Sequence, residues 1–318
     1  MTATVASAVI TSLDALLAIV LAPLFIGWID QCRAWLQNRR GAGLLQPYRT
    51  IRKLLHKDAV IAHGASPLFR VSPYVQFGAM AMAAAIIPVF SIAAPLGFAA
   101  DTIALVGVFA LARVFMALAA MDIGTAFGSL GARREMLVGF LAEPALLMVF
   151  LTASLISQST LLPTIVAALS EIHLTIFPSL AFAAIAFVMV LLAENARIPI
   201  DNPSTHLELT MIHEAMVLEY SGRHLALIEW SSALKLLNYA TIGIALFVPW
   251  GLASRDAGVA ELALALPITA AKLSVAGAAL ALIETLSAKL RIFRAPEFLA
   301  TAFLLAVLGL LVRLLLGG

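Results

Sequence analysis

Residues 102 to 121 read Thr-Ile-Ala-Leu-Val-Gly-Val-Phe-Ala-Leu-Ala-Arg-Val-Phe-Met-Ala-Leu-Ala-Ala-Met, an apolar run interrupted by one charge, Arg113. A helix needs about 20 predominantly apolar residues to cross the hydrocarbon core of a bilayer, so this stretch predicts a transmembrane helix. Seven further runs of spanning length lie at about 5 to 29, 73 to 93, 136 to 157, 175 to 193, 231 to 252, 260 to 283 and 297 to 316. The sequence therefore predicts an all-α membrane protein with about eight transmembrane helices in one polytopic domain, residues 1 to 318.

The composition of the whole chain supports this fold class. Hydrophobic residues make up 62% of the chain and charged residues 12%, with a mean hydropathy of +1.02, whereas soluble domains contain about 25% charged residues. This excludes a soluble globular enzyme. The net charge of +2 comes from 20 Lys and Arg against 18 Asp and Glu, which is too balanced for the clustered basic surface of a nucleic-acid-binding protein. The single cysteine, Cys32, excludes an iron-sulfur or Cys-based metal site made by this chain alone, and we expect no cofactor or metal bound by it.

The basic residues of the loops predict the orientation in the membrane, because Lys and Arg of short loops stay in the cytoplasm. The segments at about 30–72, 122–135, 194–230 and 284–296 are rich in such residues, while the alternate loops near 94–101, 158–174 and 253–259 contain Arg255 alone. We therefore expect the first four segments to be cytoplasmic and both termini to lie on the periplasmic side of a bacterial inner membrane. The first span has no preceding Lys or Arg and is long, which favours its retention over cleavage as a signal peptide.

Two of the cytoplasmic segments are too long to be simple turns. Residues 47 to 58 place Tyr48, Ile51, Leu54 and Leu55 at helical spacing with basic residues between them, which predicts an amphipathic helix lying in the membrane interface. Residues 194 to 229 form a long acidic loop that holds a third of the acidic residues of the chain, namely Glu194, Asp201, Glu208, Glu214, Glu219 and Glu229.

Five ionisable residues lie inside expected spans: Asp14, Arg113, Glu143, Lys235 and Lys272. Each costs roughly 2.5–3.5 kcal/mol on insertion scales and is expected to face protein or water. We interpret Glu143, Lys235 and Lys272 as functional residues. For Asp14 and Arg113, the alternative is an ion pair that only holds helices together. Pro144 follows Glu143 and frees the carbonyl of Phe140, which suits hydrated, polar surroundings. The alternative is an ordinary proline kink near the membrane edge.

The acidic loop does not have the pattern of a zinc site. His213-Glu214 lacks the second histidine that a zinc-peptidase helix needs four residues on, because Val217 stands there. Glu208 and Glu219 are eleven residues apart, close to three helical turns. Such carboxylates could pass protons if burial raised their pKa values toward neutrality. A solvated acidic loop is the alternative.

Four stretches together resemble one family of membrane proteins, and the likeness covers essentially the whole chain. They are Gly41-Ala-Gly-Leu-Leu-Gln-Pro-Tyr48, Arg134-Glu-Met-Leu-Val-Gly-Phe-Leu-Ala-Glu-Pro144, Glu194-Asn-Ala-Arg-Ile-Pro-Ile-Asp201 and His206-Leu-Glu-Leu-Thr-Met-Ile-His-Glu-Ala-Met-Val-Leu-Glu-Tyr-Ser-Gly222. They are similar to the membrane subunit of energy-converting nickel-iron hydrogenases, a family that includes component C of hydrogenase-4 and subunit 4 of formate hydrogenlyase. That family is related to subunit 1 of respiratory NADH dehydrogenase.

The resemblance implies a non-catalytic heel subunit that docks a soluble electron-transfer arm and couples its redox reactions to proton movement. Glu143 looks like the glutamate of the Ser-Tyr-Glu motif of the respiratory relatives, although Ala142 precedes it here. Arg197, Pro199 and Asp201 look like the Arg-x-Pro-x-Asp start of the long cytoplasmic loop. Together with the charge pattern, this predicts a proton pathway through Glu143, Glu194, Asp201, Glu208, Glu214, Glu219, Lys235 and Lys272. It also predicts docking of the soluble arm by Arg39, Arg40, Gln46, Arg52, Arg134 and Arg197.

Departures from the respiratory pattern favour a hydrogenase complex. The loop has Ser204, His206 and Glu208 where the respiratory relatives have three glutamates, and Ala42 stands where a proline is usual. The partners implied are the large and small hydrogenase subunits, iron-sulfur subunits and antiporter-like membrane subunits, with nickel-iron and iron-sulfur centres in those partners. The alternatives are the quinone-site membrane subunit of an NADH dehydrogenase-like complex and an independent ion transporter. The transporter is the weaker alternative because the chain shows no evident internal repeat.

Overall fold

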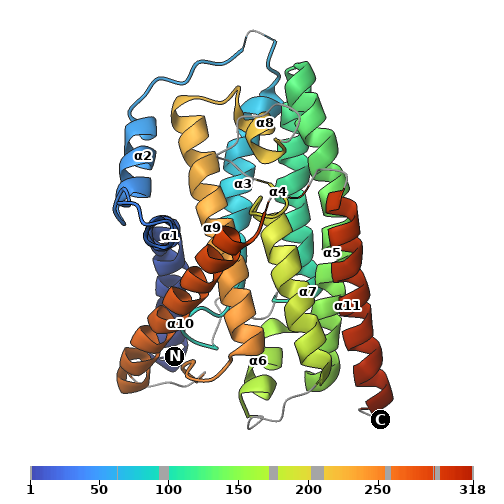
Figure 1. Cartoon of the computed structure of the whole chain (residues 1–318). Helices are drawn as coiled ribbons and strands as arrows, with labels where there is room; N and C mark the ends of the chain where they lie inside the picture. Colours follow the sequence, from blue (N-terminus) through green and yellow to red (C-terminus); the bar gives the residue numbers. More distant parts are fainter. Residues whose placement is uncertain are drawn as a thin grey trace.

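A computed structural model describes residues 2–62, 64–92, 100–171, 178–201, 211–254, 259–288, 290 and 294–316. Every regular element among these residues is a helix, as the sequence predicts. In chain order the helices are α1 (Thr2–Leu36), α2 (Gln46–Leu55), α3 (Pro67–Ile86), α4 (Thr102–Asp122), α5 (Ala126–Ser157), α6 (Leu162–Glu171), α7 (Pro178–Glu194), α8 (His213–Val217), α9 (Gly222–Phe247), α10 (Val259–Leu286) and α11 (Ala295–Leu316). The long helices stand side by side as an upright bundle, and α10 crosses diagonally against α1 and α9 (Figure 1).

Five described helices are long and apolar enough to cross a membrane. They are Asp14–Leu36 of α1, Thr102–Asp122, Ala126–Ser157, Ala263–Leu286 of α10 and Ala295–Leu315 of α11. The other three expected spans fall on α3, α7 and α9. Helix α7 has only 17 residues, while α3 and α9 carry polar residues such as Gln76 and Lys235. The chain is a multi-pass membrane protein, and the total of eight crossings stays a prediction.

Helices α3, α5 and α9 begin six to ten residues earlier than the apolar pattern indicates, and capping residues set the first turns of α3 and α5. Helix α5 starts at Ala126, where the Thr125 hydroxyl accepts a hydrogen bond from the backbone N–H of Gly128 at 3.3 Å. Helix α3 starts with Pro67. The hydroxyl of the preceding residue, Ser66, accepts a hydrogen bond from the backbone N–H of Leu68 at 3.1 Å. The basic segment expected as a loop at 122–135 is therefore mostly the first three turns of α5.

Helix α6 lies where the apolar pattern predicts only a loop. Its ten residues span about 15 Å, half of the hydrocarbon thickness, so it does not cross the membrane. The backbone N–H of Leu162 donates to the carbonyl of Ala100 at 2.9 Å, which ties the start of α6 to the segment before α4. Figure 1 shows α6 at the end of the bundle where the first residues of α1 and the last residues of α11 also lie.

The bundle is held by close packing of small and aromatic side chains. Tyr239 on α9 is fully buried and stacks on Phe109 of α4 with a ring-centroid distance of 4.9 Å. A Cβ atom at Gly309 on α11 would lie 2.8 Å from the carbonyl oxygen of Ser179 on α7. Membrane helices commonly use small residues for such close backbone approach. Helix α11 thus packs against α5 and α7, and helix α3 packs between α4 and α9.

The residues Glu219-Tyr-Ser-Gly222, the last four of the stretch from His206 to Gly222, close the end of the bundle that is expected to face the cytoplasm. The ring of Tyr220 stacks on Phe69 at 3.9 Å, and its hydroxyl donates to the Phe69 carbonyl at 3.0 Å. Ser221 bonds to the backbone of Val60. Gly222 has a φ of +53°, and a Cβ atom there would lie 2.7 Å from the Asp58 carbonyl oxygen. We call Tyr220, Ser221 and Gly222, with the chain segment 57–62 and Phe69 that they hold, the clamp.

Helix α2 occupies most of the segment expected as an amphipathic helix. Its side chain Ile51 is buried, while Arg52 and Lys53 are exposed. The hydroxyl of Tyr48 donates to the carbonyl of Val20 on α1. Helix α2 thus packs against α1 and α9 through one face and presents a basic face outward.

Candidate functional site

A buried arginine is the centre of the candidate site. Arg113 lies midway along α4, and only 5% of its surface is exposed. Its Nη1 atom is 2.7 Å from Oε1 of Glu143, and its Nε atom is 3.4 Å from Oε1 of Glu135. Its Nη2 atom pairs with Glu194. One guanidinium therefore joins three carboxylates from α5 and α7.

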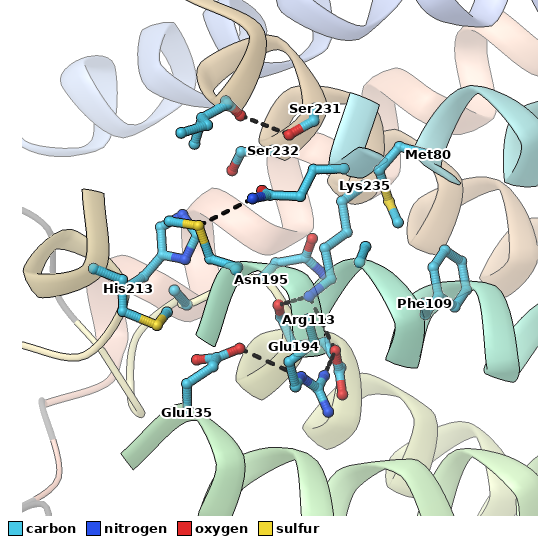
Figure 2. A pocket seen from close by; sticks show the side chains of 16 residues that line it. Met80, Phe109, Arg113, Glu135, Glu194, Asn195, His213, Ser231, Ser232 and Lys235 are labelled. Carbon is cyan, nitrogen blue, oxygen red and sulfur yellow. Dashed lines mark hydrogen bonds and ion pairs between the residues drawn. The ribbon is translucent and has the colours of Figure 1, made fainter. Parts of the chain in front are cut away.

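Lys235 on α9 completes this group of charges. Its Nζ atom is 3.0 Å from Oε2 of Glu194 and donates to the Glu194 backbone carbonyl at 2.6 Å. Figure 2 shows Lys235 and Arg113 approaching Glu194 from different elements. We call Arg113, Glu135, Glu143, Glu194 and Lys235 the ion cluster. Its three carboxylates face two cations, so uptake of one proton balances its charge, and balance matters where water is scarce.

A small polar cavity adjoins the ion cluster (Figure 2). Its volume is about 50 Å³, and its lining includes Arg113, Glu135, Glu194, Asn195 and His213. A water molecule needs roughly 10–15 Å³ of such space and two to four polar partners. The cavity therefore has room for a short chain of water molecules beside Glu194.

A second cavity continues from the first toward the end of the bundle that carries α8. It has a volume of about 200 Å³ and shares Asn195, His213 and Ser232 with the first cavity. Its lining adds Glu214 and Glu229. The two cavities thus adjoin each other between the expected cytoplasmic end and the ion cluster, and we call them together the polar route.

Glu229 is a titratable residue of this route that the predicted proton pathway omits. It lies in the first two turns of α9, before the expected span at 231 to 252. Burial raises the pKa of the Glu229 carboxyl; His213 opposes this, and Glu214 adds to it. A carboxyl whose pKa moves toward neutrality is suited to proton exchange.

The structure brings together only part of the predicted proton pathway. Glu143, Glu194 and Lys235 meet in the ion cluster, and Asp201 and Glu214 line the second cavity. The Asp201 carboxylate also accepts from the backbone N–H groups of Ile212 and His213 at 3.2 and 3.1 Å. Asp201 thus holds the start of α8.

The other predicted pathway residues lie elsewhere. Glu208 lies outside the described residues, and Glu219 is exposed. Lys272 on α10 donates to the carbonyls of Val248, at 2.6 Å, and Trp250. A cation at the carbonyl end of a helix is stabilising, so Lys272 caps α9 and does not touch the ion cluster.

The predicted docking residues divide into exposed and internal groups. Arg39, Arg40, Gln46 and Arg52 are exposed on the segment between α1 and α3. Arg134 instead donates to the carbonyl of Met211 at 2.9 Å and so holds α8 against α5.

Arg197 points inward, to an acidic residue that no motif marks in the sequence. Its Nη1 atom is 3.2 Å from Oε1 of Glu284 on α10. Nε of Arg33 on α1 is 3.5 Å from the other oxygen of this buried carboxylate. Glu284 therefore joins α1, α10 and the start of the acidic loop.

Comparison with known proteins agrees with this architecture. A family model described as NADH dehydrogenase matches residues 9–315. Formate hydrogenlyase subunit 4 of Escherichia coli (strain K12) is 35% identical over 298 residues, 93% of this chain and 95% of that protein. Hydrogenase-4 component C of the same organism is 35% identical over 243 residues, 76% of each chain.

More distant relatives share the family or the fold. A subunit of NADH-quinone oxidoreductase from Phocaeicola vulgatus is 25% identical over 222 residues, 69% of this chain and 61% of that protein. A chain in the structure of the archaeal membrane-bound sulfane sulfur reductase, a respiratory membrane complex, superposes with a TM-score of 0.77 at 21% identity, covering 95% of this chain and 98% of that chain. That likeness shows the fold alone. The match over residues 9–315 and the two 35%-identical relatives show that this chain belongs to the NADH dehydrogenase family, together with the membrane subunits of formate hydrogenlyase and hydrogenase-4.

Proposed function

We propose that the chain anchors a membrane-bound nickel-iron hydrogenase complex and couples its redox reaction to proton translocation. The observation that carries this proposal is the ion cluster, because it joins four helices deep in the bundle and adjoins a polar route to the expected cytoplasmic end. Buried ionisable groups inside spans are costly and commonly mark ion pathways. The relationship to formate hydrogenlyase subunit 4 supports the hydrogenase context.

The proposed coupling uses the charge imbalance of the ion cluster. With one proton bound, three carboxylates and two cations are balanced; without it, one negative charge is left in a poorly solvated place. A change of charge in the soluble arm near the second cavity would alter the proton affinity of Glu229 and then of the ion cluster. The proton would pass through the small cavity beside Glu194 and leave by Glu143, whose side chain is 30% exposed.

The redox chemistry itself belongs to partners in this proposal. Cys32 alone cannot hold an iron-sulfur cluster, so the nickel-iron and iron-sulfur centres would reside in the hydrogenase large and small subunits and the iron-sulfur subunits. Arg39, Arg40, Gln46 and Arg52 would contact this arm. An antiporter-like membrane subunit would cover Glu143, because a half-buried carboxylate facing lipid is unfavourable.

A third cavity, which shares Ile26, Asp30 and Glu229 with the second cavity, favours the second candidate, a quinone-site subunit of an NADH dehydrogenase-like complex. It has a volume of about 220 Å³ and lies between α1, the segment 42–51 and α9, with Asp30, Gln46 and Glu229 in its lining. The 25% identity with a subunit of NADH-quinone oxidoreductase points the same way. Purification of the intact complex separates the two: nickel and hydrogen evolution support the first, whereas NADH-dependent reduction of a short-chain quinone without nickel supports the second.

The coupling role is tested with the intact complex in sealed vesicles. Glu143→Gln and Glu194→Gln keep the side-chain shape but cannot bind the proton. We expect both variants to assemble and to evolve hydrogen with a soluble artificial donor, while turnover-linked proton translocation is largely lost. Glu297→Gln, which changes an exposed glutamate of α11, is the matched control. Full translocation in both cluster variants would contradict the proposal.

A further inference from the structure

Arg113 separates the small cavity from Glu143. The cavity lining includes the side chains of Arg113, Glu135 and Glu194 but stops short of Glu143. Glu143 meets the Nη1 atom of the guanidinium at 2.7 Å, whereas the two cavity-lining carboxylates, Glu135 and Glu194, meet its Nε and Nη2 atoms. The Arg113 side chain is only 3% exposed, whereas that of Glu143 is 30% exposed. The guanidinium therefore lies between the small cavity and Glu143 and closes the polar route at that point.

A glycine makes room for this closure. Glu135, Gly139 and Glu143 are spaced by four residues on α5, so they share one helical face. A Cβ atom at Gly139 would lie 2.8 Å from Cδ and 2.9 Å from Cζ of Arg113. Real Cβ atoms are not found this close. Any larger residue at 139 would push the guanidinium away from one or both of the glutamates on either side of it.

A guanidinium cannot act as a proton relay, because it keeps its proton in proteins. As a fixed positive charge in a narrow polar passage, it also repels protons and other cations. Arg113 therefore interrupts the route that the carboxylates on its two sides would otherwise complete.

We propose that Arg113 is a positioning residue that seals the proton route at rest, and that Gly139 is the site that lets it do so. A proton reaches Glu143 only when turnover draws the guanidinium away from its carboxylates. This inference rests on the proposed coupling function for its biological meaning. The seal itself can be measured without turnover.

The experiment measures passive proton leak through the intact complex in sealed proteoliposomes, with an imposed pH gradient and no electron donor. Arg113→Gln removes the charge, and we expect a several-fold faster leak. Arg113→Lys keeps the charge without the planar fork, and we expect a leak close to that of the unchanged protein. A purely structural role for Arg113 would make the two variants behave alike.

Gly139→Ala supplies an independent test that retains every charge. We expect its leak to rise, because the methyl group displaces the guanidinium. Gly107→Ala on α4 is the matched control, since a Cβ atom there meets nothing within 4 Å, and its leak should be unchanged. If Arg113→Gln and Gly139→Ala both seal as well as the unchanged protein, the proposal is overturned. Absence of turnover-linked translocation in the unchanged complex would refute the coupling function but leave this comparison valid.

Discussion

Ser221 is joined to Val60 by two hydrogen bonds across 161 residues of chain. The Ser221 hydroxyl accepts from the backbone N–H of Val60 and donates to the Val60 carbonyl, each at 2.9 Å. One side chain thus pairs with both backbone groups of a residue that belongs to no helix. The clamp thereby fixes the connection between α2 and α3 to the start of α9.

We expect Ser221→Ala to loosen this connection without unfolding the bundle. Loss of the two hydrogen bonds should lower the free energy of unfolding by about 1–2 kcal/mol. Limited proteolysis should become faster within residues 56–62, while the membrane helices stay protected. Ser129→Ala on α5, outside the clamp, is the control. Unchanged cleavage in Ser221→Ala would show that packing of Tyr220 on Phe69 holds the segment by itself.

Glu284→Ala should destabilise the protein strongly. The carboxylate side chain is only 1% exposed and is shared by Arg33 and Arg197. Its removal takes a carboxylate away from Arg197 and leaves Arg33 with Asp30, and breaking a buried pair costs roughly 3–5 kcal/mol. Because the side chain of Arg33 is 24% exposed, water will offset part of this loss. Thermal melting in detergent measures the effect, and a melting temperature equal to that of Glu297→Gln would contradict the assignment.

Reversal of Arg39, Arg40 and Arg52 to Glu should release the soluble arm from membranes. These side chains are exposed on one connected segment, and charge complementarity supports association in a salt-dependent way. The measurement is the amount of hydrogenase module that stays with washed membranes at moderate salt. Arg313→Glu is the control, because Arg313 lies in the last turn of α11, and Figure 1 shows the C-terminal end of α11 far from α2. Retention of the module by the triple variant would place docking elsewhere.

Acid should destabilise the start of α9 through His224. Burial lowers the pKa of the His224 imidazole, and the neighbouring charges of Arg223 and Arg70 lower it further. The unfolded chain, with a histidine pKa of about 6.5, then binds more protons than the folded chain. The free energy of unfolding is therefore highest above a pH of about 6.5. It decreases as the pH falls from there toward the lower pKa that His224 has in the folded protein. His224→Gln should flatten the dependence of melting temperature on pH between about 7 and 5; an unchanged slope would exclude His224 as the cause.

The sequence predicts the helical membrane fold well, because spanning helices are encoded locally in apolar runs. The positions of α4 and α11 differ from their expected ranges by one or two residues. Helix α6 and the early start of α5 are not visible in hydropathy. They depend on caps and on contacts with distant backbone, such as that between Leu162 and Ala100.

The candidate site is only partly predictable for the same reason. Glu143 and Lys235 stand out because a charge within an apolar run is costly. Glu135 lies at the edge of its run, in the segment expected as a loop, although its spacing of eight residues from Glu143 places both on one helical face. The partner of Arg197 is 87 residues away in the chain, and no local pattern encodes such a pair. Three-dimensional packing decides it.

The order in which the ion cluster residues occur along the chain bears on how the protein enters the membrane. Arg113 precedes Glu143 by 30 residues, and Glu194 precedes Lys235 by 41. During synthesis, α4 and α5 can therefore pair Arg113 with Glu143 within one hairpin before α7 and α9 exist. The second pair follows in the same manner. Insertion thus pairs each cation of the ion cluster with a carboxylate instead of leaving it as an isolated ion in lipid, and the ion pair between Arg113 and Glu194 joins the two halves when the later helices arrive.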